Sequence, residues 1–129
     1  MSHVAALSQV VLLMLTSAIP RFLYGGGNKQ SNADYGDIWA LSLPGFHWTK
    51  VSDATKAERA EHACVSTRST MLSFGGSRLF TDAAFSQKDE FDRGIGIFNL
   101  NTLEWDASYN ADAEGYKTHD RIMQGYNDG

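Results

Sequence analysis

The sequence predicts an all-β fold in which one small antiparallel sheet occurs more than once, and two observations carry this prediction. An apolar run that ends in consecutive glycines occurs twice, at residues 21–27 and at residues 70–76. Each run is followed by an alternating segment that leads to a tryptophan: residues 37–43 with Trp48, and residues 96–100 with Trp105. The two glycine pairs begin at residues 25 and 75, and a period of about 50 residues is typical of repeated supersecondary units.

The spacing before each tryptophan predicts how the strands pair. Trp48 follows Leu41, and Trp105 follows Phe98, after the same number of residues. Because a strand alternates its faces and a tight turn reverses the chain, the two large side chains of each copy are expected on one face of a sheet. The glycines fit the same unit, since a residue without Cβ adopts positive φ and lets neighbouring backbone approach closely.

Strand signals continue along the chain between segments rich in Gly, Asn and Asp. We expect strands at residues 22–24, 38–43, 46–51, 62–66, 70–74, 94–100 and 103–107. Residues 43–46 and 100–103 are short connections at equivalent places, and both predict hairpins. Their agreement supports one unit that is repeated.

The first 20 residues are apolar and leave two interpretations open. Residues 4–19 resemble a secretory signal whose small-residue site is at residues 16–18, although the start of the chain lacks the usual positive charge. Alternatively, residues 2–7 form a degraded first strand that corresponds to residues 61–65. The segment is shorter and more polar than the span of about 20 residues that a transmembrane helix needs, so no membrane span is expected in this chain.

The chain resembles a kelch-repeat β-propeller. Residues 62–65 and 71–76 match the first two strands of a blade, and Phe98 and Trp105 match the aromatic residue and the tryptophan of the family. Arg59 and His62 match an Arg and a His that often precede the first strand. Within the family, residues 37–44 and 94–98 are most similar to fungal kelch proteins related to the galactose oxidase central domain.

The resemblance implies a partial kelch-type β-propeller. A propeller has about four to eight blades of four strands each, and 129 residues supply two to three four-stranded antiparallel blades of about 50 residues. The ring is therefore expected to be incomplete: a fragment of a larger propeller, a truncated gene product, or one part of an assembly of several chains. Residues 1–20 would be the apolar N-terminal segment, residues 21–110 the kelch-repeat region and residues 111–129 a polar C-terminal tail that includes a short helix.

Composition excludes some classes of partner. The chain has a formal net charge of −4, and its Lys and Arg residues are scattered. A nucleic-acid partner is therefore not expected, because such proteins carry a basic patch or stripe. The single cysteine, Cys64, falls in an expected apolar strand, where a buried free thiol is the usual role. It says nothing about the compartment, which the sequence leaves open between the cytoplasm and a secreted or membrane-associated parent protein.

No catalytic, cofactor-binding or metal-ligating residue is expected. The four histidines, His3, His47, His62 and His119, are dispersed without metal-ligand spacing. Asp89 and Glu90 are expected to form a solvated charge cluster, since no calcium-loop pattern surrounds them. Relatives that oxidise sugars use a copper site with a cysteine cross-linked to a tyrosine, and no matching motif surrounds Cys64.

The loop at residues 77–93 is the main asymmetry between the two copies. It is seven residues longer than its counterpart and carries seven charged residues and Phe80, Phe85 and Phe91. Either it is a solvated surface loop that its phenylalanines hold to the sheet, or it is a binding loop on a rigid scaffold.

From the family we expect a non-enzymatic module that binds a partner protein, with self-association through open blade flanks as a further expectation. The alternative is a remnant of a carbohydrate-active, galactose oxidase-like enzyme without its catalytic site, and a decayed gene without function is a third interpretation.

Overall fold

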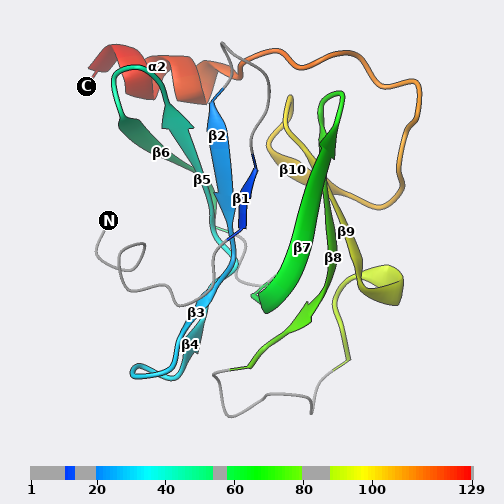
Figure 1. Ribbon diagram of the computed structural model, residues 1–129. Coiled ribbons are helices and arrows are strands. Elements are labelled where there is room, and N and C mark those ends of the chain that lie inside the picture. Colours follow the sequence, from blue (N-terminus) through cyan, green and yellow to red (C-terminus); the bar gives the residue numbers. More distant parts are fainter. Residues whose placement is uncertain (1–10, 14–19, 54–57, 80–87, 129) are drawn as a thin grey trace.

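The computed structural model describes residues 11–13, 20–53, 58–79 and 88–128, and it confirms the all-β class. The strands form two four-stranded antiparallel sheets and one two-stranded hairpin, and one short α-helix follows them (Figure 1). All seven strands predicted between residues 22 and 107 are present, with bounds that differ by a few residues.

The two four-stranded sheets follow the chain in the same order. The first sheet has the order β1-β2-β5-β6 and the second the order β7-β8-β9-β10. The strands of the first sheet are β1 (Val11–Leu13), β2 (Arg21–Tyr24), β5 (Ile38–Ser42) and β6 (His47–Ser52). Those of the second are β7 (Ala60–Thr67), β8 (Thr70–Ser77), β9 (Ile95–Asn99) and β10 (Glu104–Asp106).

The register of the strands shows that the two sheets are equivalent. The residue before each double glycine pairs with an isoleucine of the next long strand, Tyr24 with Ile38 and Phe74 with Ile95. On the outer hairpin of each sheet, Leu41 pairs with Trp48 and Phe98 pairs with Trp105. The predicted cross-strand position of both tryptophans is therefore confirmed.

The first strand of the first sheet lies at another place than expected. Val11 pairs with Tyr24 as Ala63 pairs with Phe74, so Val11–Leu13 is the strand that lies opposite β2. Residues 2–7 and the signal-like site at residues 16–18 lie outside the described residues.

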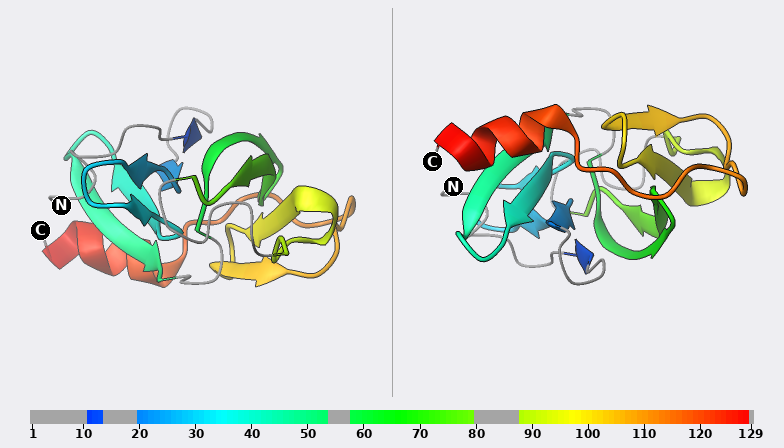
Figure 2. Two further views of the ribbon diagram at one scale, coloured as in Figure 1. Left: turned by 90° about the horizontal axis from the view of Figure 1, so that it is seen from below. Right: turned by 90° about the horizontal axis from the view of Figure 1, so that it is seen from above.

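The core lies between the two sheets. The inner face of the first sheet packs against the Phe98 face of the second, and the buried cluster has Phe22, Tyr24, Ile38, Ala40, Val51, Met71, Phe98, Leu100, Leu103 and Ile122. The sheets stand side by side as two twisted layers, with β1 next to β7 (Figures 1 and 2). Burial of one face on each sheet explains the alternation in β5, where Ile38, Ala40 and Ser42 are buried and the residues between them are half-exposed.

Three smaller elements complete the structure. β3 (Gly27–Asn28) and β4 (Ala33–Asp34) form a short hairpin between β2 and β5 that the sequence analysis did not predict. The 3-10 turn η1 (Asp92–Gly94) precedes β9. The tail ends in α2 (Asp120–Asp128), as predicted, and this helix packs against β6 (Figure 1). None of the helices in the described ranges has the length and hydrophobicity to span a membrane.

The tail returns from the second sheet to the first. Ser69 at the β7–β8 turn donates a hydrogen bond to the carbonyl of Glu114 over 2.7 Å, and Asn101 at the β9–β10 turn accepts one from the N–H of Lys117 over 2.7 Å. Next to Lys117, the Tyr116 ring lies 6.1 Å from the Phe22 ring, and farther along the tail Ile122 enters the core. The tail therefore fastens both sheets at one end, along the path that Figure 1 shows in orange.

Candidate functional site

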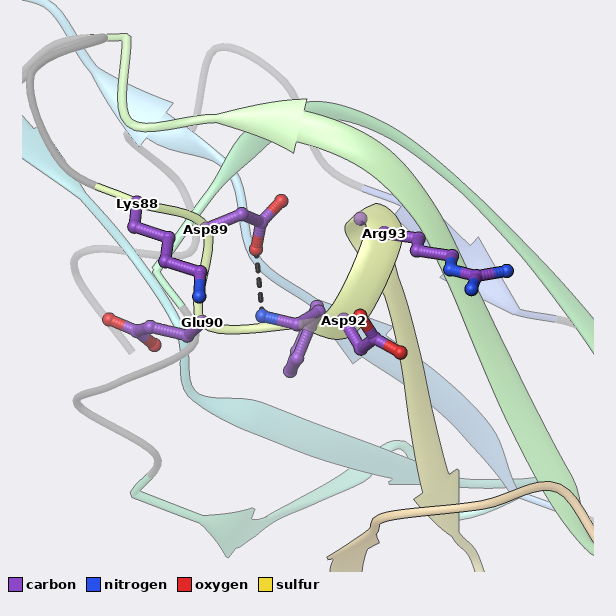
Figure 3. Close-up of a pocket in the computed structure, with 7 residues that line it drawn as sticks. Lys88, Asp89, Glu90, Asp92 and Arg93 are labelled. Carbon is purple, nitrogen blue, oxygen red and sulfur yellow. Dashed lines mark hydrogen bonds between the residues drawn. The ribbon is translucent and has the colours of Figure 1, made fainter.

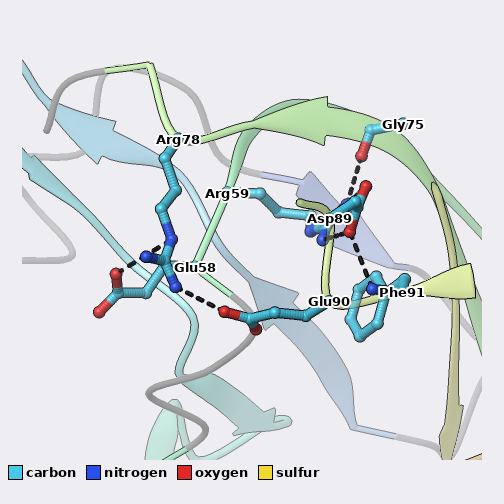
Figure 4. A network of polar contacts seen from close by, with 7 residues as sticks. All are labelled: Glu58, Arg59, Gly75, Arg78, Asp89, Glu90 and Phe91. Carbon is cyan, nitrogen blue, oxygen red and sulfur yellow. Dashed lines mark hydrogen bonds and ion pairs between the residues drawn. The ribbon is translucent and has the colours of Figure 1, made fainter. Parts of the chain in front are cut away.

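The candidate site is built around Arg59, which lies just before β7. Its side chain is only 4% exposed. Nη1 donates a hydrogen bond to the carbonyl of Gly75 over 2.7 Å, and Nη2 donates one to Oδ1 of Asp89 over 2.7 Å (Figure 4). A buried guanidinium needs such partners, because a charge removed from water without them is costly. Arg59 thus joins the start of the second sheet to the loop that follows β8.

Phe91 completes the base of this loop. Its ring lies 4.1 Å below the Arg59 guanidinium, an arrangement in which the ring attracts the cation. The same ring lies 4.6 Å from the ring of Trp105. A side chain on Gly96 would overlap the Phe91 ring, so this glycine makes room for it. The expectation that a phenylalanine holds the loop to the sheet is met by Phe91, whereas Phe80 and Phe85 lie outside the described residues.

Asp89 and Glu90 each have an arginine partner. Arg59 pairs with Asp89, and Arg78 pairs with Glu90 over 2.6 Å and with Glu58 over 3.7 Å (Figure 4). Asp89 also accepts a hydrogen bond from the N–H of Phe91 over 2.9 Å. The expected solvated charge cluster is instead an ordered ion-pair network in which both carboxylates are about one-third exposed.

The network shifts the pKa values of the two carboxyl groups in opposite directions. Partial burial raises the pKa of Asp89, but hydrogen bonds from Arg59 and Phe91 and the charge of Arg59 outweigh it, so that the pKa lies below its ordinary value. For Glu90, burial and the nearby carboxylates raise the pKa more than Arg78 and Arg59 lower it. Asp89 is therefore held as a carboxylate.

A shallow hollow of about 450 Å³ lies over this loop and is lined by residues 88–94 (Figure 3). Asp89 and Glu90 are partly exposed and turn toward their arginine partners, and Lys88, Asp92 and Arg93 are exposed as well. The surface of the hollow therefore offers both a carboxylate and two cations to a partner.

Backbone contacts connect the site to the first sheet. The N–H of Gly26 donates to the carbonyl of Arg59 over 2.9 Å, and the N–H of Arg59 donates to the carbonyl of Tyr35 over 3.1 Å. Gly25 has φ +73°, and a Cβ on it would lie 2.7 Å from the Arg59 carbonyl. The glycine pair thus has the role that the sequence analysis assigned to it, since it lets the chain before β7 approach the first sheet.

His62 is buried behind Arg59. Its ring lies 4.8 Å from the ring of Tyr24, in an edge-to-face arrangement. Burial and, to a smaller extent, the positive charge of Arg59 lower the pKa of His62 to about 4. Burial also raises the pKa of Tyr24. His62 is therefore a neutral imidazole within the interface between the sheets.

The other residues considered in the sequence are dispersed. His119 accepts a hydrogen bond from the N–H of Arg121 at the start of α2, over 3.0 Å, and His47 lies on β6. His3 lies outside the described residues. Burial raises the pKa of the Cys64 thiol to about 12, so this side chain is a neutral, half-buried neighbour of the core.

Sequence reasoning found part of this site. The resemblance to the kelch family singled out Arg59 and His62, and the long loop drew attention to residues 77–93. The partners of Arg59 and the triad of Arg78 with Glu58 and Glu90 were missed, because the residues are far apart in the sequence. Among residues 11–13, 20–53, 58–79 and 88–128, no group of three or more His, Cys, Asp or Glu residues could hold a metal ion.

No known family model matches the chain, and no curated protein matches it significantly.

Proposed function

We propose that the chain is a kelch-type β-propeller module that binds a partner protein and has no catalytic activity of its own. In this proposal the two four-stranded sheets are two blades, and residues 88–94 form the binding surface. No cofactor takes part.

The repeated register supports the propeller part of the proposal. Both sheets run in chain order, their first strands β1 and β7 lie next to each other, and both place a tryptophan at the same position of the last strand. Stacking of one face of a sheet on the opposite face of the next is the way in which repeat units bury a continuous core.

The observation that carries the binding role is the attachment of the loop to buried Arg59. The loop is held from below by the Asp89 and Phe91 contacts, while Lys88, Asp92 and Arg93 remain exposed above it. Residues that are already held in place, as Asp89 and Phe91 are here, lose less conformational entropy when a partner binds, and this favours recognition. The mixture of one carboxylate and two cations suits a polar protein surface that carries both signs of charge.

The test compares two variants of the tagged, full-length chain. Partners are cross-linked and captured, and their amounts are measured for the wild type, for the triple variant Lys88→Ala, Asp92→Ala, Arg93→Ala, and for the control Arg68→Ala. Arg68 is a comparably accessible cation at the β7–β8 turn, at the other end of the sheet. We expect the triple variant to lose at least one specific partner that the control retains. Capture that is the same for all three proteins would overturn the proposed surface.

A further inference from the structure

The two sheets present unlike outer faces. On the first sheet, the face turned away from the core has Trp39, Leu41 and Trp48, all partly exposed, since their neighbours Ile38, Ala40 and Ser42 point into the core. The cross-strand pairs Trp39 with Lys50, and Arg21 with Leu41, place two cations on this face. We call it the tryptophan face.

On the second sheet, the face turned away from the core has several exposed apolar side chains. Val65 is 48% exposed, Phe74 is 41% exposed and Ile95 is 40% exposed. Val65 pairs with Leu72, Leu72 pairs with Ile97, and Ile97 pairs with Asp106. These four side chains therefore lie on the same side of the sheet. Glu104 is on this side of β10 as well, because it alternates with Trp105, which points into the core. We call it the phenylalanine face.

The contact inside the chain shows how these two kinds of face fit together. The second sheet turns Phe98 and Trp105 toward the first sheet, and these residues are equivalent to Leu41 and Trp48 in register. The first sheet turns Tyr24 toward the second, and Tyr24 is equivalent to Phe74. Trp105 contacts Tyr24 directly, with ring centres 5.2 Å apart. The outer phenylalanine face therefore matches, position by position, the face that already receives a tryptophan within the chain.

Charge also distinguishes the two outer faces. The tryptophan face carries Arg21 and Lys50, of which Lys50 also pairs with Asp53 over 3.0 Å. The phenylalanine face carries Glu104 and Asp106. Opposite charges on two surfaces favour their association and oppose contact between two copies of the same surface.

We propose that the phenylalanine face of one chain binds the tryptophan face of a second copy of this chain, with Trp48 of one copy on Phe74 of the other. The contact is head-to-tail, because two different surfaces meet. Such a contact closes into a ring or grows into an open chain of subunits. The inference concerns the outer sheet faces and goes beyond the proposed partner binding, which uses the loop at residues 88–94.

The proposed head-to-tail association is tested by sedimentation velocity of the protein over a range of concentrations, which measures the size of its assemblies. Phe74→Glu blocks the phenylalanine face and Leu41→Glu blocks the tryptophan face, because each places a charge where an apolar side chain would be buried in the contact. We expect the wild type to form higher assemblies with rising concentration, and each variant alone to weaken association by about tenfold or more, as for a central interface residue. Met123→Glu on α2, where the side chain is 47% exposed, is the matched control and is expected to assemble like the wild type.

A mixture of the two variants is the decisive sample. Phe74→Glu retains an intact tryptophan face and Leu41→Glu retains an intact phenylalanine face. The two blocked faces carry like charges and do not attract each other, so we expect an equimolar mixture to form a dimer and nothing larger. A second pair of variants is used if either of the first two unfolds. Val65→Glu blocks the phenylalanine face and Lys50→Glu blocks the tryptophan face, and both change exposed side chains. A wild type that stays monomeric, or a mixture that does not dimerise, would overturn the proposal. The triple loop variant tests partner binding alone, since it is expected to assemble normally.

Discussion

Nη2 of Arg59 donates a hydrogen bond over 2.7 Å to Oδ1 of Asp89, which is 30 residues away in the sequence. Through this bond, Arg59 holds Asp89 in place, in the part of the β8–β9 loop that leads into β9. The alternating pattern of the strands does not predict this contact. The energetic importance of this contact can be measured directly.

We expect Arg59→Ala to lower the free energy of unfolding by about 3 kcal/mol, because the change removes a buried partner from the Gly75 carbonyl and from Asp89. Chemical denaturation monitored by tryptophan fluorescence measures this change in the free energy of unfolding. Arg93→Ala changes an exposed arginine of the same loop and is expected to cost less than about 0.5 kcal/mol. Equal effects of the two substitutions would contradict the assigned role of Arg59.

Substitutions at Gly75 and Gly76 distinguish the cost of backbone strain from the cost of steric overlap. Gly75 has φ +68° with open space around its Cβ position, so Gly75→Ala is expected to cost about 1 kcal/mol. Gly76 has φ +75°, and a Cβ there would lie 2.6 Å from the Ala60 carbonyl, so Gly76→Ala is expected to cost clearly more. Gly115→Ala, where nothing lies within 4 Å, is the control. Thermal unfolding of the three variants should give the order Gly76, Gly75, Gly115 from the largest loss to the smallest.

His62 predicts a loss of stability in mild acid. Its folded pKa is lowered from 6.5 to about 4, so the unfolded chain binds more protons between these pH values. The free energy of unfolding therefore falls as the pH falls through this window, by about 2 kcal/mol after allowance for partial solvent screening. The lowered pKa of Asp89 acts in the same direction at lower pH.

Denaturation at a series of pH values measures this effect. His62→Gln should flatten the dependence on pH between pH 6.5 and pH 4, whatever its effect on stability at neutral pH. A slope that is the same in the variant and the wild type would assign the acid sensitivity to other groups.

The tail predicts a contrast between two neighbouring residues of α2. Ile122 is 1% exposed and lies in the core between the sheets, so Ile122→Ala is expected to cost about 3 kcal/mol. Met123 is exposed, and Met123→Ala is expected to cost less than about 0.5 kcal/mol. Calorimetric melting of both variants measures the difference, and a small effect of Ile122→Ala would mean that the tail is not part of the core.

The sequence was sufficient for the parts of the fold that depend on local pattern. Alternation located the strands, and the equal spacing of Trp48 and Trp105 from Leu41 and Phe98 predicted the outer pairs, because a hairpin turn fixes register. The hairpin of β3 and β4 was missed, since each strand has only two residues and neither shows alternation.

The candidate site was harder to predict, since its residues meet through the fold. Phe91 could be named as one of three phenylalanines in the loop, but nothing in its neighbourhood shows that it lies beneath Arg59. The polar contacts of the tail were missed for the same reason. Asn101 and Lys117 are ordinary surface residues in the sequence, and only the arrangement of the hairpins brings them together.

The packing of the C-terminal tail on the first sheet affects how the protein unfolds. In a linear array, a terminal unit can unravel while its neighbour stays folded. In this chain, β6 belongs to the first sheet and is covered by α2. This helix follows the last strand of the second sheet in the sequence. Detaching either sheet therefore disrupts the other, and amide protons in both are expected to exchange with solvent through one shared opening event.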